Sequence, residues 1–380
     1  MLQIVAVPQQ FRDLVDRFIR VPWYIHREHA PNDVWVPPLL MDRRDYLNPK
    51  KNPFFDHAEV ALWVAVKDGR DVGRIAAVVD HDFVAFHEEK TGYFGMFECI
   101  DDREVAEALF ERASRWLNER GMERMMGPMD LSANYTCGVL VDSFDQEPFV
   151  GMPYNPPYYE ALIESCGLSA EKTLVQWGMS AQSPLAPRVD RISKLIAKRE
   201  GIRVRTMDFD DWDNEVERVL EIYNTAWEKN WGFVPMPAKE FRHICKDVKM
   251  LLHPKLAMIG EIDGQPVAFS LTIKNVNPIL KKIDGKLFPF GALRLGWDLK
   301  VKDRVDSARL ILLGVRSSHR KRGIDSILFA ETFRAANSLG YKDCEIGWVL
   351  EDNELVNRAI RAMDGKPVKN YRIFQRSCDA

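Results

Sequence analysis

The sequence predicts a mixed α/β protein that contains two copies of one domain, and three observations support this. A pair of apolar strand patterns joined by an Asp-Gly turn, the strongest short hairpin signal, occurs over residues 61–79 and again over 256–273. The elements after each hairpin follow in the same order in both halves. A polar stretch with two prolines separates the halves. We expect domains at 1–180 and 202–380, joined by a linker at 181–201.

Each half has the same order of expected elements. Helical sequence comes first, over 11–25 in one half and over 216–231 and 239–252 in the other. After each hairpin we expect a strand, an amphipathic helix ended by glycine, a second strand, and then a last helix and an aromatic strand. In the first half these are 93–97, a helix ending at Gly121, 122–126 and 158–177; in the second they are 310–315, a helix ending at Gly340, 345–350 and 354–374.

Length and composition agree with two globular domains. The chain has 380 residues, and a domain takes roughly 100–200. Hydrophobic residues make up 46% and charged residues 29%, which excludes disorder over most of the chain. The 53 Lys and Arg nearly balance the 56 Asp and Glu, so no overall basic field favours nucleic acid, and we expect no nucleic-acid partner.

Targeting signals and cysteine usage indicate the compartment. The six cysteines form no CxxC pair, and the N-terminus lacks the basic and apolar regions of a secretory signal. No apolar run approaches the ~20 residues of a membrane helix. We therefore expect a cytoplasmic protein without a membrane span. The histidines are scattered, and we expect no metal.

A basic turn between the strand at 310–315 and the following helix is the sharpest local feature. Amide groups at a helix N-terminus favour phosphate oxygens, basic side chains add attraction, and glycine permits close approach to the backbone. Here the candidate residues are Arg320, Lys321, Arg322, Gly323, Ile324, Asp325 and Ser326. The alternative is a solvated basic loop without a ligand.

In its element order and this Arg-x-x-Gly turn, the second half resembles the GNAT superfamily of acyl-CoA N-acyltransferases. The resemblance implies that the turn binds the pyrophosphate of acetyl-CoA or a longer acyl-CoA. Asp325 departs from the family's small residue; it either lies near the phosphates or complements the helix dipole. Gly314 interrupts the apolar strand, and such a glycine marks a bulge or a close approach of the backbone, or is merely tolerated by packing. The family's strand before the turn bulges, splays from its neighbour and pairs with the pantetheine arm, which implicates Gly314 and Val315. Asn353 matches a cofactor-contacting asparagine, or else caps the next helix.

The first half resembles a GNAT domain without the signature. Its equivalent turn, at residues 97–105, is acidic and has no glycine. Because acidic groups repel a pyrophosphate, we predict that this degenerate copy binds no acyl-CoA and instead helps to form the acceptor cleft.

The catalytic residues are harder to choose, because no tyrosine occupies residues 343–365, where many GNAT enzymes carry their proton donor. Either Tyr371 from the last strand or solvent protonates the departing thiolate, or this domain does not catalyse. Glu345 and Glu351 flank the strand where the amine is expected and are the candidate bases.

Two aromatic segments are candidates for the acceptor site. Aromatic clusters either fill cores or bind apolar groups, and the second interpretation implies a small-molecule or lipid-like amine. The residues are Trp227, Asn230, Trp231 and Phe233 in the second half and Asn134, Tyr154 and Tyr158 in the first.

These features predict an acyl-CoA-dependent N-acyltransferase in which a primary amine attacks the thioester directly. Two alternatives remain at this stage. One is a non-catalytic acyl-CoA-binding or sensor protein, favoured by the missing tyrosine and by Asp325. The other is a Fem-like aminoacyl transferase, which the near-neutral charge and the absence of a helical-hairpin insertion disfavour.

Overall fold

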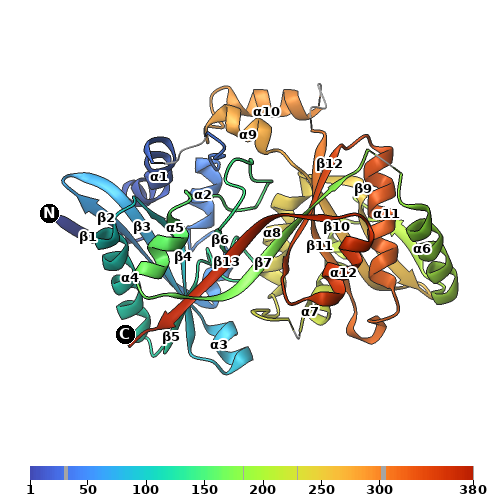
Figure 1. Ribbon diagram of the computed structural model, residues 1–380, viewed down its shortest axis with the longest axis horizontal. Helices are drawn as coiled ribbons and strands as arrows, with labels where there is room; N and C mark the ends of the chain where they lie inside the picture. The colour runs from blue at the N-terminus through green and yellow to red at the C-terminus, as the bar shows by residue number, and fades with distance from the viewer. Residues whose placement is uncertain (30–32, 183, 229, 301–304, 380) are drawn as a thin grey trace. The chain divides into compact units, whose positions relative to one another are not determined.

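The computed structural model describes residues 1–29, 33–182, 184–228, 230–300 and 305–379. The fold is the predicted mixture of helices and strands (Figure 1). The contacts within the chain divide it into two compact units. Unit 1 comprises residues 1–174, 277–296 and 369–380, and unit 2 comprises residues 175–276 and 297–368.

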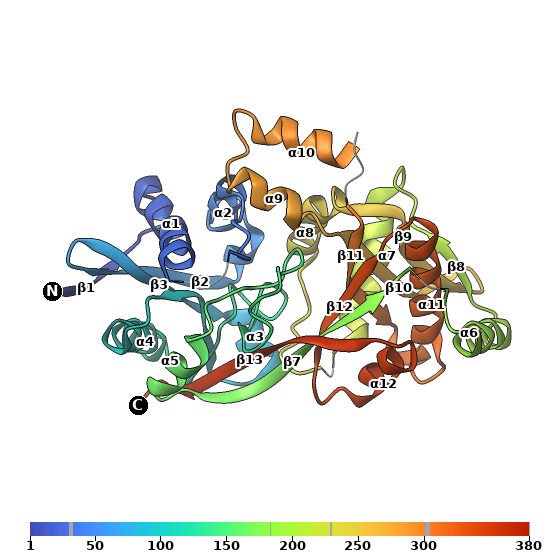
Figure 2. The ribbon, with the colours of Figure 1, turned by 45° about the horizontal axis from the view of Figure 1, so that its top comes forward.

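These units cut the chain differently from the sequence repeat. The first division falls inside strand β7 (Ser169–Ser180), and a segment from the middle of the second half belongs to unit 1. The expected linker contains helix α6 (Pro187–Glu200), which packs against α11 (Ile324–Ser338) in unit 2 (Figures 1 and 2). The sequence repeat reflects the order of elements along the chain, whereas the compact units depend on which elements contact one another in space.

Unit 1 contains a mixed sheet that is antiparallel except between β4 and β5. Its strands are ordered β1-β2-β3-β4-β5-β13, with β6 paired to β13. The predicted hairpin turn is present, because Asp68 and Gly69 have φ values of 51° and 79°, the left-handed region that Asp and Gly tolerate. Helices α1 and α4 both pack on β3, from opposite sides (Figure 2). The elements are β1 (Leu2–Ala6), α1 (Arg12–Glu28), α2 (Leu40–Tyr46), η1 (Pro53–Asp56), β2 (Ala58–Lys67), β3 (Arg70–Asp80), α3 (His81–His87), β4 (Thr91–Cys99), α4 (Arg103–Asn118), β5 (Arg124–Gly127), β6 (Val139–Leu140), α5 (Tyr159–Ser165), α9 (Asn277–Ile283), the first part of α10 (Gly291–Lys300) and most of β13 (Lys366–Ser377).

Unit 2 repeats this plan with the strand order β7-β12-β11-β10-β9-β8. Its hairpin turn has the same backbone, with φ values of 51° at Asp263 and 75° at Gly264. One core lies between the strands and α11, where Ile324, Ile327 and Leu328 pack on Ala268 and Met258. The remaining elements are β8 (Arg203–Thr206), α7 (Trp212–Ala226), α8 (Ala238–Lys249), β9 (Leu252–Ile262), β10 (Gln265–Lys274), β11 (Ser307–Val315), η2 (Ser317–His319), β12 (Asp343–Leu350) and α12 (Glu354–Ala362).

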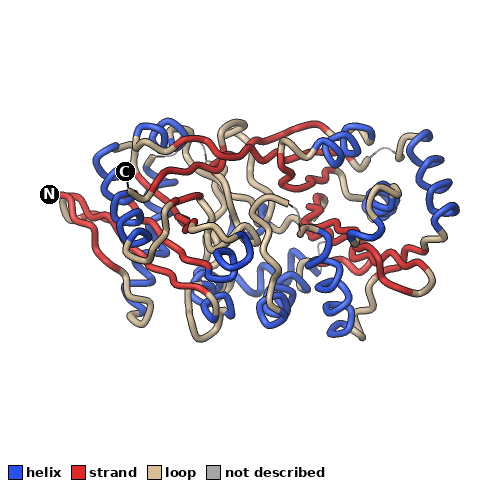
Figure 3. The backbone as a smooth tube through the Cα atoms, turned by 90° about the horizontal axis from the view of Figure 1, so that it is seen from below, coloured by secondary structure: helices blue, strands red, loops and turns tan. Residues whose placement is uncertain are grey.

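The two units share one feature that matters for function. In each, an antiparallel strand is followed by a helix and then by a parallel neighbour: β4, α4 and β5 in unit 1, and β11, α11 and β12 in unit 2. The helices flank the strands in both units (Figure 3). Over the described residues, no helix combines the length and the apolar character that crossing a bilayer requires.

Candidate functional site

Strands β11 and β12 of unit 2 separate part of the way along their length. They pair from Ser307 opposite Asp343 to Leu310 opposite Ile346, and the ladder ends there. Beyond this point β11 pairs only with β10 on its other side, among the described residues. The edge of β11 from Ile311 onward therefore offers backbone groups to a ligand, as an unpaired strand edge does.

The irregularity in β11 lies at Ile311 and not at Gly314. The register with β10 passes from Leu312 to Leu310 between Leu271 and Thr272, so Ile311 is the extra residue. The other expected role of Gly314 is present, because aromatic rings pack closely against the backbone there. A Cβ at this position would lie 2.8 Å from the ring of Trp227 and 2.9 Å from that of Phe269. Val315, half-buried, ends the strand opposite Ala268.

In the basic turn the backbone amide groups are available to a ligand, whereas some of the basic side chains are paired within the protein. Gly323, with φ 80°, is the N-cap of α11, and Lys321 also has a positive φ of 61°. Within the described part of the chain, no protein acceptor lies on the backbone N–H groups of residues 321–326. Lys321 is exposed, while the side chain of Ile324 is buried in the core. These amides can receive an anion at the start of the helix.

The two arginines of the turn have partners within the protein. Arg320 donates to the carbonyl oxygens of Thr225, at 3.2 Å, and Ala226 at the end of α7. Arg322 forms an ion pair of 2.5 Å with Glu200 of α6. Hydrogen bonds to Arg199 and Arg322 lower the pKa of the Glu200 carboxyl, so it is ionised at neutral pH. Arg322 thus shares its charge with Glu200.

Helix α6 also covers one flank of this turn. A Cβ at Gly323 would lie 3.0 Å from the side chain of Ile196, and the Arg199 guanidinium donates to the Arg322 carbonyl at 3.1 Å. Asp325 and Ser326 are half-buried in the first turn of α11, where an acidic residue complements the helix dipole. Asn353 is the N-cap of α12 and accepts from the Val356 amide at 3.4 Å, which agrees with its alternative role.

The three candidate catalytic residues have different environments. Glu345 lies inside the paired part of β12, is 6% exposed, and accepts from Gln176 Nε2 at 2.9 Å. Glu351 is exposed in the turn after β12. Tyr371 is 0% exposed and lies opposite Leu140 of β6 in unit 1, whereas both glutamates belong to unit 2. Complete burial of Tyr371 disfavours it as a proton donor.

The aromatic residues of the second half mostly form a core. The rings of Trp227 and Phe233 lie 5.0 and 5.7 Å from that of Tyr223, and Trp227 also contacts Phe269. Asn230 donates its amide to the Trp227 carbonyl, and Trp231 is half-buried.

In the first half, one of the three candidates lines a cavity. Tyr154 does so; Tyr158 instead donates to the Cys99 carbonyl at 2.7 Å, and the Asn134 amide donates to Ser132 Oγ.

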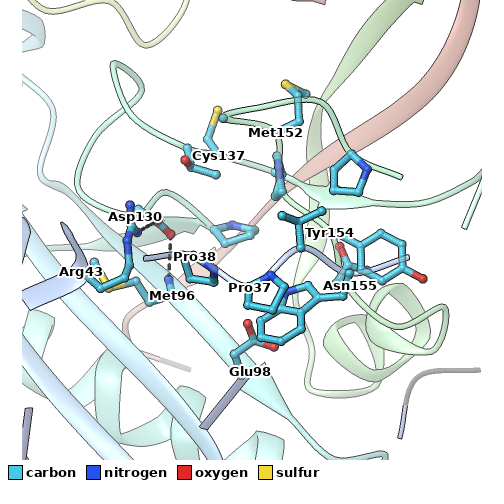
Figure 4. Close-up of a pocket in the computed structure, with 18 of the residues that line it drawn as sticks. Pro37, Pro38, Arg43, Met96, Glu98, Asp130, Cys137, Met152, Tyr154 and Asn155 are labelled. Atoms are coloured by element: carbon cyan, nitrogen blue, oxygen red, sulfur yellow. Dashed lines mark hydrogen bonds and ion pairs between the residues drawn. The ribbon is translucent and has the colours of Figure 1, made fainter. Parts of the chain in front are cut away.

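That cavity, of about 310 Å³, lies within unit 1 (Figure 4). Prolines, aliphatic side chains and Trp35 form much of its wall, and five charged residues also line it. In Figure 4, Asp130 lies beside Arg43 and Met96, with Glu98 below Pro37 and Pro38. The charged residues are Asp42, Arg43, Arg74, Glu98 and Asp130.

The carboxylates of Glu98 and Asp130 are held by other elements. Tyr159 of α5 donates to Glu98 Oε2 at 2.7 Å, and His26 Nε2 of α1 lies 3.4 Å from the same oxygen. Arg74 Nη2 of β3 lies 3.6 Å from Glu98 Oε1. The Met96 amide donates to Asp130 Oδ1 at 3.3 Å, and Arg43 Nη1 lies 3.4 Å from Asp130 Oδ2.

The pKa values of the two carboxylates move in opposite directions. Burial alone would raise the pKa of Glu98, but the neighbouring His26, Arg74 and Tyr159 hold it below its usual range. Burial raises the pKa of Asp130, and Arg43 and Arg74 only partly oppose this. Carboxyl groups shifted apart in one cavity are typical of a functional site.

Sequence reasoning missed this charged cluster, although a signal was present. Arg74 interrupts the apolar strand at 72–79, and Glu98 ends another apolar run. A charge within a buried strand is costly unless it is paired or used. Among the described residues, no three His, Cys, Asp or Glu side chains gather in a way that would hold a metal ion.

Comparison with known proteins gives matches that span nearly the whole chain. No protein-family model matches it. The chain is 37% identical over 380 residues to the bacterial ceramide synthase of Caulobacter vibrioides (strain NA1000 / CB15N), covering 98% of this chain and 97% of that protein. It is 34% identical over 364 residues to protein YghO of Escherichia coli (strain K12), covering 94% and 92%.

Two solved structures show similar folds at low sequence identity. The tandem GNAT protein from the clavulanic acid biosynthesis pathway matches with a TM-score of 0.58 and 12% identity over 100% of this chain and 99% of that one. A GCN5-related N-acetyltransferase from Sphaerobacter thermophilus matches with a TM-score of 0.53 and 13% identity over 99% and 96%. The matches concern both units, not one copy alone.

Proposed function

The chain belongs to the family of the bacterial ceramide synthase and has the tandem GNAT fold that its repeat predicts, and we propose from this that it is an acyl-CoA-dependent N-acyltransferase acting on a long-chain amine. Acyl transfer is the activity that family and fold have in common. The finer parts of the proposal are the acyl-CoA site in unit 2 and the amine site in unit 1.

The separation of β11 from β12 carries the proposal for acyl-CoA. The free edge of β11 beyond Leu310 leads to the turn whose amides, at residues 321–326, have no acceptor among the described residues. A pantetheine arm carries amide groups that pair with such an edge, and a pyrophosphate suits the amides of a helix N-terminus. Lys321 and Arg322 would add charge-assisted contacts.

The reaction proceeds by direct attack in this proposal. The ammonium of the acceptor first gives a proton to a base, and the nitrogen lone pair then attacks the thioester carbonyl carbon. A C–N bond forms and the C–S bond breaks; the thiolate takes a proton, from solvent or an acid, and leaves as free coenzyme A. The exposed Glu351 is the better candidate base of the two glutamates, because Glu345 already binds Gln176 inside the sheet.

The unit 1 cavity supports the choice of acceptor. A ceramide is an N-acylated long-chain amino alcohol, and the chain's relative is a ceramide synthase. Glu98 and Asp130 suit an ammonium group. The buried Nε atoms of Arg43 and Arg74 have no hydrogen-bond partner among the described residues and suit hydroxyl oxygens. The apolar wall suits the start of an alkyl chain.

Two measurements test the proposal in sequence. Calorimetry with acetyl-CoA and a C16 acyl-CoA should show binding, and mass spectrometry should then detect an amide when sphinganine is added. Absence of binding to both thioesters by the folded protein would overturn the proposal. Binding without any product, across short-chain and long-chain amines, would instead support the acyl-CoA sensor.

A further inference from the structure

The segment around helix α10 exposes an unusual concentration of large apolar side chains. Phe288 is 71% exposed, Phe290 75%, Leu293 71% and Trp297 54%. We call these four residues the aromatic face. Single exposed apolar residues are ordinary, but several within one short segment mark an interaction surface.

The spacing of these residues places most of them on one side of a helix. Phe290, Leu293 and Trp297 recur three and four residues apart along helical sequence, which places them on one side of α10. Asp298, one residue further, is only 5% exposed and so points elsewhere. An amphipathic helix with Trp, Phe and Leu on one side is typical of segments that lie at a membrane interface.

The charges around the face are basic. Lys282, Lys286 and Arg294 are exposed, and none forms an ion pair within the described part of the chain. The acidic residue among them is already neutralised, because Asp284 accepts from Arg27 at 2.7 Å and from Trp23 Nε1 at 3.0 Å. The surface therefore carries a local positive charge although the chain as a whole has a formal net charge of −3.

The preceding helix α9 is anchored to unit 1. Asn277 donates to the Pro148 carbonyl at 2.6 Å, Lys281 forms an ion pair of 3.1 Å with Glu147, and the Leu40 amide donates to the Gly285 carbonyl at 3.0 Å. Asn277 and Leu280 also line the unit 1 cavity. The aromatic face thus follows directly in the chain from residues of that cavity.

We propose that the aromatic face docks on the surface of an anionic lipid bilayer. Its apolar side chains enter the boundary between headgroups and acyl chains, and Lys282, Lys286 and Arg294 contact anionic headgroups. Charge selects this occupant over a second copy of the chain, because two such faces brought together would place their unpaired cations against each other. The proposal does not depend on the acyltransferase activity, although docking would bring a lipid amine to the enzyme.

Vesicle co-sedimentation of the full chain tests the proposal. We expect the protein to sediment with vesicles of phosphatidylcholine and phosphatidylglycerol and to remain in solution with phosphatidylcholine alone. Phe290→Ser with Leu293→Ser should weaken partitioning at least tenfold, and Lys282→Gln with Lys286→Gln should reduce it and flatten its salt dependence. Met250→Ser, at a residue 80% exposed in unit 2, is the matched control and should bind as the unchanged protein does.

Three outcomes would overturn docking. The unchanged protein does not sediment with either vesicle; the Phe290→Ser/Leu293→Ser protein partitions as well as the control; or light scattering shows a dimer that this double substitution dissociates, with no vesicle binding. Transfer to a water-soluble short-chain amine is measured in parallel. If docking fails while this transfer persists, the proposed function stands without the membrane surface.

Discussion

The two units carry the same pair of parallel strands, yet only one pair stays open beyond its short ladder. In unit 2 the ladder of β11 and β12 ends at Leu310, and the edge of β11 beyond it is available. In unit 1 the ladder of β4 and β5 ends at Tyr93, and the chain then folds back over β4: the Met129 amide donates to the Phe94 carbonyl at 2.8 Å.

Glycines in the two strands show how different these arrangements are. A Cβ at Gly95 of β4 would overlap the backbone oxygen of Met129, whereas the three atoms nearest to a Cβ at Gly314 of β11 belong to aromatic side chains. The opening that suits a pantetheine arm is thus filled by main chain in unit 1. The same architecture thus holds a filled strand edge and a charged cavity in one copy, and an open strand edge in the other.

The largest expected effect comes from alanine substitutions at these two glycines, which test the difference between the units. Gly95→Ala should lower the free energy of unfolding by about 3–5 kcal/mol, because backbone atoms cannot move aside. Gly314→Ala should cost about 1–2 kcal/mol, since the rings of Trp227 and Phe269 can shift. Urea denaturation measures both, and equal losses would contradict the difference between the units.

The next test compares the turns before α11 and α4. Arg322→Glu should weaken acyl-CoA binding by about 2–4 kcal/mol, through loss of a charge-assisted contact and added repulsion. The control is Arg103→Glu, at a residue with a 65% exposed side chain in the equivalent turn of unit 1, which should leave affinity unchanged. Calorimetry measures both affinities. Equal weakening by the two substitutions would contradict a specific role of the turn before α11 in binding acyl-CoA.

Thermal unfolding at different pH values tests how the carboxylates of the unit 1 cavity contribute to stability. The lowered pKa of Glu98 means that its carboxylate stabilises the fold above the unfolded-state pKa, and this stability is lost as pH falls through the folded-state pKa. Glu98→Gln should therefore cost about 1–3 kcal/mol at pH 7 and less near pH 4.

Asp130 should behave in the opposite way. Burial raises its pKa, so its contribution is full below the unfolded-state pKa and is lost as pH rises through the folded-state pKa. Asp130→Asn should therefore raise the Tm at pH 7 but not near pH 4, while weakening the binding of sphinganine. A lower Tm at pH 7 would show that the ion pair with Arg43 outweighs the cost of burial.

The smallest effect concerns helix α6. Glu200→Gln should strengthen acyl-CoA binding only roughly threefold, because an ion pair near the surface competes weakly for Arg322. Titration calorimetry resolves such a change, and weaker binding would mean that Glu200 orients Arg322 for the ligand and does not compete with it.

Local patterns predicted the hairpins, the glycine-capped helices and the basic turn, because each depends on residues near one another in the chain. Asp68 and Gly69 form the expected turn, and Gly323 starts α11 in the left-handed conformation. The repeated order predicted the tandem GNAT fold, which the comparisons confirm. The roles of the individual turn residues in binding acyl-CoA stay predictions.

Long-range contacts were not predictable in this way. Nothing near Arg320 in the sequence indicates the carbonyls of Thr225 and Ala226, and nothing near Arg322 indicates Glu200. The bulge was expected near Gly314 and lies at Ile311, because the register with β10 decides it. Glu98 and Asp130 are distant in sequence, and only folding brings both to one cavity.

The amino-acid order alone thus determined which elements form and that the domain occurs twice, since turn chemistry and hydrophobic periodicity act over a few residues. Only the tertiary structure decided which copy keeps an open strand edge, where the buried charges meet, and which basic groups stay free for a ligand. Those outcomes depend on the packing of distant segments: a backbone oxygen from Met129 fills one site, and a carboxylate from Glu200 shares the charge of the other.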